Sequence, residues 1–328
     1  MISRRTIVRT VSAAVVGLTG LPAPRAQEAG RTYRIGGLFA SRRDAPQHVA
    51  LFDGLRRNGF LLGHNLNLYP RGYGLRPEQF ADIAVEQVNA NIDLIMCGGD
   101  PAIRAAQRAS TTIPIVALTD DMVGSGLVRS LANPGGNTTG VSVLAPQLDG
   151  KRQEILMDVV PGLRRMAALA DPNTSRPREL QALREAARSR GVELAVHQVV
   201  KPEDIVPAID AAKSAGATAL NVLATPLLFS NRRIIFERAA ALRLPGVYQW
   251  PEMAEDGGLV AYGPRITEVF RELMARQVAR VLRGAKPADV PVEQPTKFEL
   301  VINLKTAKAL GLTIPPSVLT RATQVIDP

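Results

Sequence analysis

The sequence predicts an α/β protein with two doubly wound lobes, each built on a parallel sheet. Short apolar segments typical of buried strands alternate with segments whose apolar residues recur at helical spacing. Strands this apolar, separated by helices, indicate parallel sheets covered on both faces. The length of residues 27–328 is more typical of two domains than of one. The alternation forms two successive sets with no long low-complexity linker between them.

The first set starts with the apolar strand YRIGGLFA. An amphipathic helix follows it and ends at Asn58-Gly59. The buried strand DLIMC runs into Gly98-Gly99, and Pro101 opens the next helix. Strands are expected at 33–40, 65–69, 93–97, 113–118 and 138–143, with helices up to 58, over 77–89 and from 101.

The second set follows the same order of strands and helices. Its last helix is strongly amphipathic, and Gly284 and Pro287 end it, as the chemistry of helix C-termini predicts. Strands are expected at 166–170, 192–196, 219–223, 246–250 and 258–262, and helices at 149–160, 177–190, 203–215, 231–242 and 266–283.

Residues 1–26 are typical of an export signal peptide. The apolar run 11–21 is too short to cross a bilayer, which needs about 20 residues, but it fits the apolar region of a secretory signal. The stretch SRRTIV also matches a twin-arginine address. Cleavage near Gln27 would leave a periplasmic protein without a lipid anchor. The competing interpretation is a disordered N-terminus.

Composition and motifs argue against several classes of protein. The formal net charge is +10, but the basic residues are scattered, which disfavours nucleic-acid binding. Cys97, the only cysteine, lies in an apolar strand and is expected to be a buried thiol. The three histidines lack the spacing of a metal site. Gly124-Ser125-Gly126 lacks the third glycine of a dinucleotide-binding motif, so no enzyme and no cofactor are expected.

Several segments carry a resemblance to a known family: YRIGGL, TTIPIV, VGSGLVRSLANPGGNTTGVS, GLVAYGP and GAKPADVPVEQPTKFELVINLKTAKALGLTIPPS. They resemble the solute-binding components of ABC importers, and more narrowly the subfamily that includes tryptophan and tyrosine binding proteins. The resemblance implies a type I periplasmic-binding-protein fold, in which two lobes joined by a three-segment hinge close over a small molecule. It also implies an ABC permease of the inner membrane as the partner of a monomeric protein.

The lobe boundaries follow from the points where the chain is expected to cross. Crossings are predicted near 142–146, near 263–265 and between 290 and 297. The first lobe then comprises residues 33–143 and 264–292, and the second comprises 144–263 and 293–328.

Ligands of open α/β sheets bind beyond the carboxyl ends of the strands, so the residues there are the binding candidates. The predicted ligand-binding residues are Ser41, Asp100, Pro101, Ala102, Asp121, Ser142, Thr225, Tyr248 and Gln249. Arg42 and Arg43 fit a carboxylate clamp and equally fit solvated loop residues.

Asp100 and Asp121 each allow two interpretations. Pro101 opens a helix whose free amides at Ala102 and Ile103 would form an anion site, but Asp100 fits a helix cap as well. Asp100 also departs from the relatives, which more often have serine or threonine there. Asp121 matches an aspartate common in the family and could hold a ligand ammonium group, or it could only shape a turn.

Strand ends of the second lobe add further candidates. Trp250 fits both a stacking surface for a planar ligand and a core residue, and Tyr262 presents the same choice. Asp171 and Asn173 follow another strand.

The sequence therefore predicts a non-enzymatic solute-binding protein of an ABC importer, with an amino acid or a related small molecule as ligand. The alternative is a periplasmic sensor of the same fold that signals to a membrane kinase. A transcription-factor effector module shares this fold, but a DNA-binding headpiece is not found where the export leader stands.

Overall fold

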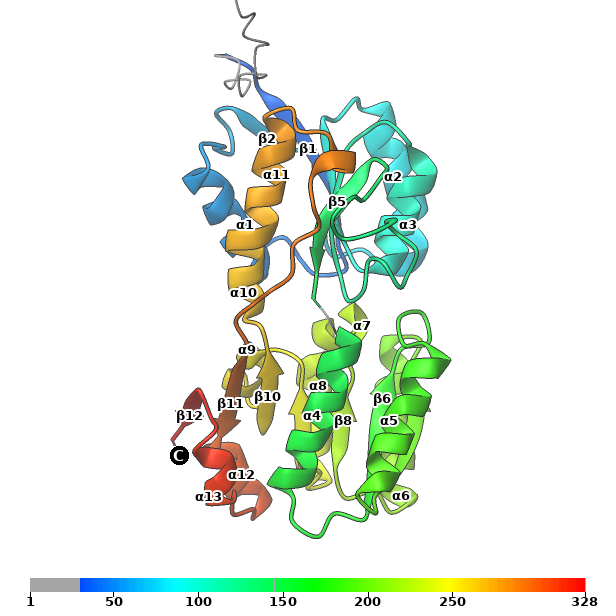
Figure 1. The fold of residues 1–328 in the computed structure, drawn as a ribbon, viewed down its shortest axis with the longest axis vertical. Coiled ribbons are helices and arrows are strands. Elements are labelled where there is room, and N and C mark those ends of the chain that lie inside the picture. Colours follow the sequence, from blue (N-terminus) through cyan, green and yellow to red (C-terminus); the bar gives the residue numbers. More distant parts are fainter. Residues whose placement is uncertain (1–29, 144, 328) are drawn as a thin grey trace, which may run out of the picture.

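The computed structural model describes residues 30–143 and 145–327, and it contains two α/β lobes arranged end to end (Figure 1). The sheet of the first lobe has the strand order β2-β1-β3-β4-β5, and all its pairs are parallel. Its strands are β1 (Tyr33–Leu38), β2 (Leu66–Leu68), β3 (Leu94–Gly98), β4 (Ile115–Thr119) and β5 (Thr138–Ser142).

Helices cover both faces of this first sheet (Figure 1). The helical segments are α1 (Pro46–Arg57), η1 (Pro77–Gln79), α2 (Phe80–Asn89), α3 (Asp100–Ala109), η4 (Pro287–Asp289) and the continuous run α10 (Ile266–Glu268), η3 (Val269–Met274) and α11 (Ala275–Leu282). Gly54 lets α1 approach that last run closely, since a Cβ there would lie 2.1 Å from the Arg271 carbonyl oxygen. The η3 segment is wound as a π-helix, which the apolar periodicity did not predict.

The second lobe holds a sheet with the order β12-β11-β10-β9-β8-β6-β7. Its strands are β6 (Arg165–Ala170), β7 (Glu193–Gln198), β8 (Leu220–Val222), β9 (Gly246–Tyr248), β10 (Val260–Gly263), β11 (Glu299–Asn303) and β12 (Gln324–Ile326). The expectation of a purely parallel sheet is wrong here, because β11 runs antiparallel to β10. The reason is topological: β10 leads the chain out of this lobe and β11 leads it back in.

The helical segments of the second lobe include several short ones that the sequence did not predict. They are α4 (Ala145–Val159), α5 (Pro177–Ser189), η2 (Pro202–Asp204), α6 (Ile205–Ser214), α7 (Pro226–Ser230), α8 (Arg232–Ala241), α9 (Pro251–Glu255), α12 (Leu304–Leu310) and α13 (Pro316–Leu319). Both α7 and α9 begin with proline directly after a strand and its short loop. They therefore sit at the carboxyl ends of β8 and β9, facing the first lobe.

The chain passes between the lobes at three places, after β5, between β10 and α10, and between η4 and β11. The third passage runs beside the first, because the Ser142 amide donates to the Glu293 carbonyl and the Glu293 amide donates to the Gly140 carbonyl, both at 2.9 Å. The boundaries given above for the two lobes stay a prediction.

Two remaining expectations concern the core and the terminus. Cys97 is fully buried in β3, which confirms the prediction of a buried thiol. The predicted leader lies outside the described residues. Within the described part of the chain, no helix is long and apolar enough to cross a membrane.

Candidate functional site: a cleft between the lobes

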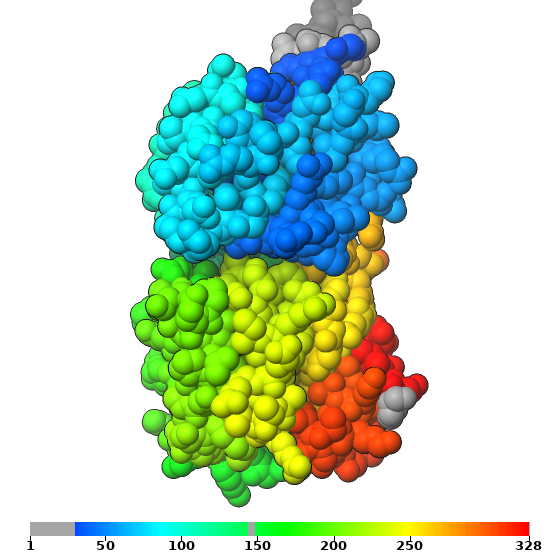
Figure 2. Space-filling model, turned by 180° about the vertical axis from the view of Figure 1, so that it is seen from behind, coloured from blue at the N-terminus to red at the C-terminus, as the bar shows by residue number. Residues whose placement is uncertain are grey.

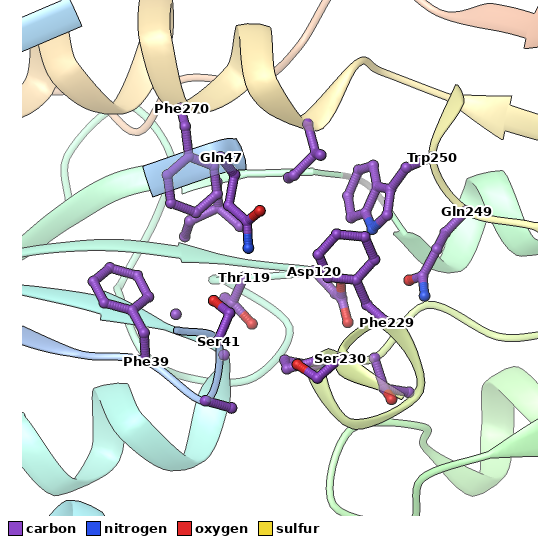
Figure 3. A pocket seen from close by; sticks show the side chains of 17 residues that line it. Phe39, Ser41, Gln47, Thr119, Asp120, Phe229, Ser230, Gln249, Trp250 and Phe270 are labelled. Carbon is purple, nitrogen blue, oxygen red and sulfur yellow. The ribbon is translucent and has the colours of Figure 1, made fainter. Parts of the chain in front are cut away.

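The carboxyl ends of β1, β3, β4, β8 and β9 meet where the two lobes touch, and a cleft lies between them (Figures 2 and 3). It contains about 600 Å³ of empty space, its open mouth included. Its lining residues are Phe39, Ala40, Ser41, Gln47, Gly98, Gly99, Leu118, Thr119, Asp120, Thr225, Pro226, Phe229, Ser230, Gln249, Trp250, Ile266 and Phe270.

Aromatic side chains from both lobes form much of the wall (Figure 3). Phe39 and Phe270 come from the first lobe, with ring centroids 6.2 Å apart. Phe229 and Trp250 come from the second lobe and meet edge to face at 6.4 Å. Such walls favour a ligand with a flat apolar part. Trp250 is both buried and part of the cleft wall.

Asp120 is the only charged residue among those that line the cleft. Its carboxylate accepts no hydrogen bond from any described residue. Burial raises the pKa of Asp120 well above its usual value, and the neighbouring carboxylates of Asp149 and Asp100 raise it further, against the effect of Arg152. A carboxylate in this state is stabilised by a cation, so the cleft favours a ligand that carries a positively charged group.

The predicted site residues fall into three groups. Ser41, Thr225 and Gln249 line the cleft. Asp100 and Asp121 line a neighbouring polar pocket that holds about 330 Å³ of empty space and shares Asp120 with the cleft. Pro101, Ala102, Ser142 and Tyr248 line neither.

The carboxylates of the two predicted acids already accept hydrogen bonds from neighbouring residues. Asp121 accepts hydrogen bonds from the Gly124 amide at 2.8 Å and from Arg176 at 3.4 Å. Asp100 accepts the hydroxyl of Thr119 at 2.5 Å. Asp100 does not cap α3, because Gly99 is the N-cap residue and no side chain caps it. The expected free amide of Ile103 is absent too, since it donates to the Gly99 carbonyl at 3.2 Å.

The candidates outside the cleft have structural contacts. Ala102 is in the core of the first lobe, and Ser142 accepts from the Met122 amide at 3.3 Å. Tyr248 packs edge to face on Phe236 at 4.9 Å.

Apart from Trp250, the sequence candidates that allowed two interpretations lie away from the cleft as well. Arg42 forms an exposed pair with Asp44, and Arg43 lies over the ring of Phe52. Tyr262 stacks on Phe298, and the Asp171 carboxylate accepts from the Asn173 amide.

Sequence reasoning missed Asp120 and most of the aromatic wall. It ended the fourth strand at 118, whereas β4 ends at Thr119, so the first residue after the strand is Asp120. The only signal for Asp120 was its position beside Asp121. Phe229 lies in α7, which was not predicted, and Phe270 lies in the predicted amphipathic helix at 266–283, from which no binding residue was expected.

Direct contacts join the lobes beside the cleft. Arg176 of the second lobe donates to Ser125 Oγ at 2.8 Å and to Asp121 Oδ2 at 3.4 Å, both in the first lobe. Gly99 lies against Pro226, since a Cβ on Gly99 would be 2.8 Å from Pro226 Cγ. The lobes are therefore closed on each other in this structure.

A buried arginine supports the cleft from the second lobe. Arg152 has a side chain that is 1% exposed and donates to Asp149 at 2.6 Å. It also donates to the carbonyls of Tyr262 at 2.7 Å and Gln249 at 3.3 Å. These bonds fix the backbone beside Trp250.

Comparison with known proteins agrees with this geometry. A family model described as ABC transporter substrate binding protein matches residues 48–326, most of the chain. The chain belongs to this family. The family predicted from the sequence segments is thus confirmed.

Individual relatives of this substrate-binding chain are moderately similar. A tyrosine-binding protein of Clostridioides difficile (strain R20291) is 27% identical over 237 residues, which cover 70% of this chain and 66%, less than two thirds, of the relative. A solved conserved domain protein of Vibrio cholerae has a TM-score of 0.80 at 27% identity, covering 90% of this chain and 99% of that one. An ABC domain from Streptococcus pneumonia, solved in complex with L-Trp, has a TM-score of 0.81 at 25% identity, covering 90% and 100%.

More distant solved structures agree on the fold alone. An extracellular ligand-binding receptor of Verminephrobacter eiseniae matches at a TM-score of 0.52 and 15% identity, covering 78% of this chain and 85% of that one. The predicted type I periplasmic-binding-protein fold is confirmed by these neighbours and by the parallel sheets.

Proposed function

We propose that this chain is the periplasmic solute-binding component of an ABC importer, and that its ligand is an amino acid with an aromatic side chain. The observation that carries this proposal is the combination, in one cleft between two lobes, of four aromatic side chains with the single carboxylate of Asp120. The aromatic wall suits the ligand side chain, and Asp120 suits its α-ammonium group. Relatives named for tyrosine and solved with tryptophan support the same ligand class.

The mechanism is capture by closure of the lobes. The cleft is lined from both lobes, so a ligand held there gains contacts in the closed form that the open form lacks. Only such differential contacts shift an open–closed equilibrium. The closed protein would then deliver its ligand to the permease, without any chemical step of its own. Export by the leader at 1–26 and a monomeric state belong to the same proposal.

A thermal-shift screen with the purified protein tests the ligand class. The panel contains the common L-amino acids, sugars, nucleosides and polyamines. A ligand at 100 times its dissociation constant stabilises the folded state by about 2.7 kcal/mol. We expect clear shifts with L-tryptophan, L-tyrosine or L-phenylalanine. A response confined to sugars or nucleosides would reject the proposed ligand.

The importer role needs a separate test in cells. Deletion of the gene should abolish uptake of the labelled ligand at low concentration, and the wild-type gene should restore it. Normal uptake in the deleted strain would contradict the transport role even if the ligand class is right.

A further inference from the structure

The hydroxyl of Ser41, in the cleft wall of the first lobe, has its proton directed away from the ligand. Ser41 Oγ lies 3.4 Å from His48 Nε2, and His48 Nδ1 lies 2.7 Å from the Arg42 carbonyl oxygen. A carbonyl can only accept, so Nδ1 carries the ring proton. Burial lowers the pKa of His48 to about 4, so the ring is neutral at pH 7 and Nε2 can only accept. The Ser41 hydroxyl therefore donates to His48 and turns its lone pairs to the cleft.

Thr119, the second hydroxyl of the first lobe in the cleft, is held in the same way. It donates to Asp100 Oδ1 at 2.5 Å, which leaves the oxygen of Thr119 as an acceptor for the ligand. With the carboxylate of Asp120, the first lobe presents three acceptors. Gln47, the other polar side chain there, carries both a donor and an acceptor.

The second lobe instead presents hydrogen-bond donors to the cleft. Thr225 is the N-cap of α7 and its oxygen accepts from the Leu228 amide at 3.0 Å, so its hydroxyl proton is free to donate. Gln249 is 1% exposed, and its amide nitrogen is buried without an acceptor among the described residues. A ligand acceptor group is the partner that this nitrogen lacks. The Ser230 hydroxyl makes no hydrogen bond to a described residue and can donate to the ligand or accept from it.

We propose that this division orients the ligand across the cleft. The ammonium group faces the first lobe at Ser41, Thr119 and Asp120, and the carboxylate faces the second lobe at Thr225 and Gln249. His48 acts as a positioning residue, because it accepts the Ser41 proton and so fixes the direction in which the hydroxyl donates, without touching the ligand. This inference rests on the proposed amino-acid ligand and adds its orientation. An amino acid held in this way links the lobes through its two charged ends.

Calorimetric titrations with three related ligands test the orientation. L-tryptophan carries both charged groups, tryptamine lacks the carboxylate and indolepropionate lacks the amine. For the wild-type protein, each analogue should bind at least about tenfold more weakly than L-tryptophan, because each loses a charged hydrogen-bonding group.

Variants of each lobe should then separate the two analogues. Ser41→Ala and Thr119→Val should weaken L-tryptophan and tryptamine by about three- to tenfold and leave indolepropionate within about twofold. Gln249→Leu, which keeps the α7 cap intact, should weaken L-tryptophan and indolepropionate and spare tryptamine. Thr225→Val should behave like Gln249→Leu if it folds.

A double variant tests the role of His48. His48→Phe removes the acceptor for the Ser41 proton and should weaken L-tryptophan and tryptamine as Ser41→Ala does. The double variant Ser41→Ala/His48→Phe should lose no more affinity than either single variant. His48→Gln, which retains an acceptor, should bind L-tryptophan and tryptamine as wild type does. A purely structural role for His48 predicts additive losses.

Three outcomes overturn the proposal. First-lobe variants that weaken indolepropionate and spare tryptamine would place the carboxylate on the first lobe. Variants that weaken all three ligands equally would show that the hydroxyls only support the fold. If the folded wild-type protein binds none of L-tryptophan, L-tyrosine and L-phenylalanine, the proposed function itself is wrong, and the orientation falls with it.

Discussion

Replacing Asp120 with asparagine should remove most of the affinity for an amino acid. The change keeps the shape of the side chain and removes its charge, and Asp120 is the only charged residue among the described residues of the cleft wall. A hydrogen bond to a charged partner contributes about 1.5–3 kcal/mol, so Asp120→Asn should weaken binding by roughly 10- to 150-fold.

The neighbouring acid provides a matched control. The side chain of Asp121 is 31% exposed, lines the adjacent pocket and is paired with Arg176. Exposed ion pairs contribute about 0–1 kcal/mol, so Asp121→Asn should change the dissociation constant by no more than about fivefold.

Isothermal titration at pH 7 with L-tryptophan, L-tyrosine and L-phenylalanine measures both variants. An amine-free analogue should bind wild type and Asp120→Asn with similar affinity, because it lacks the group that Asp120 holds. Binding of the amino acids by Asp120→Asn within about twofold of wild type would refute the reasoning. A larger loss in Asp121→Asn than in Asp120→Asn would instead support the assignment made from the sequence.

Three further predictions concern closure, stability and pH. Arg176→Gln removes bonds that join the two lobes, so titration should show a ligand affinity up to about fivefold weaker. Arg190→Gln, which breaks a pair within one lobe, should not change the affinity. Equal losses in the two variants would show that the bonds of Arg176 between the lobes do not favour the closed form. Arg152→Met leaves Asp149 buried without its partner, so urea unfolding should show a loss of about 3–5 kcal/mol; full stability would contradict the role of the pair. The folded-state pKa of Asp120 is raised, so its contribution to stability is present below its unfolded pKa and is lost as pH rises through the folded pKa. Ligand-free Asp120→Asn should therefore be more stable than wild type at neutral pH and not at low pH. The affinity for amino acids should fall as pH drops through that folded pKa. A pH-independent stability difference would contradict this.

The sequence predicted the buried parallel strands within one or two residues. Strands such as β3 and β6 are continuous apolar runs bounded by glycine or polar residues, and local composition is enough to locate them. It could not predict the antiparallel β11, because strand direction follows from the third passage between the lobes. It also missed the π-helical turn at 269–274, which apolar periodicity does not encode.

The site was predicted less well than the fold, for a physical reason. A shift of one residue at the end of β4 decides whether Asp120 or Asp121 faces the cleft, and sequence patterns do not fix strand ends that closely. The aromatic wall is assembled from four separate segments of the chain, including Phe229 in α7 and Phe270 in η3. Only the approach of the lobes brings these side chains together.

The most direct test of the central claim is the fluorescence of Trp250 during a ligand titration. It is the only tryptophan in the chain and it lines the cleft, so its emission reports on that site alone. Titration with L-phenylalanine and L-tyrosine, with excitation of tryptophan only, should give a saturable change whose midpoint Asp120→Asn moves to a roughly 10- to 150-fold higher ligand concentration. Constant emission, while calorimetry detects binding of the same amino acids, would place the ligand outside the cleft and contradict the account.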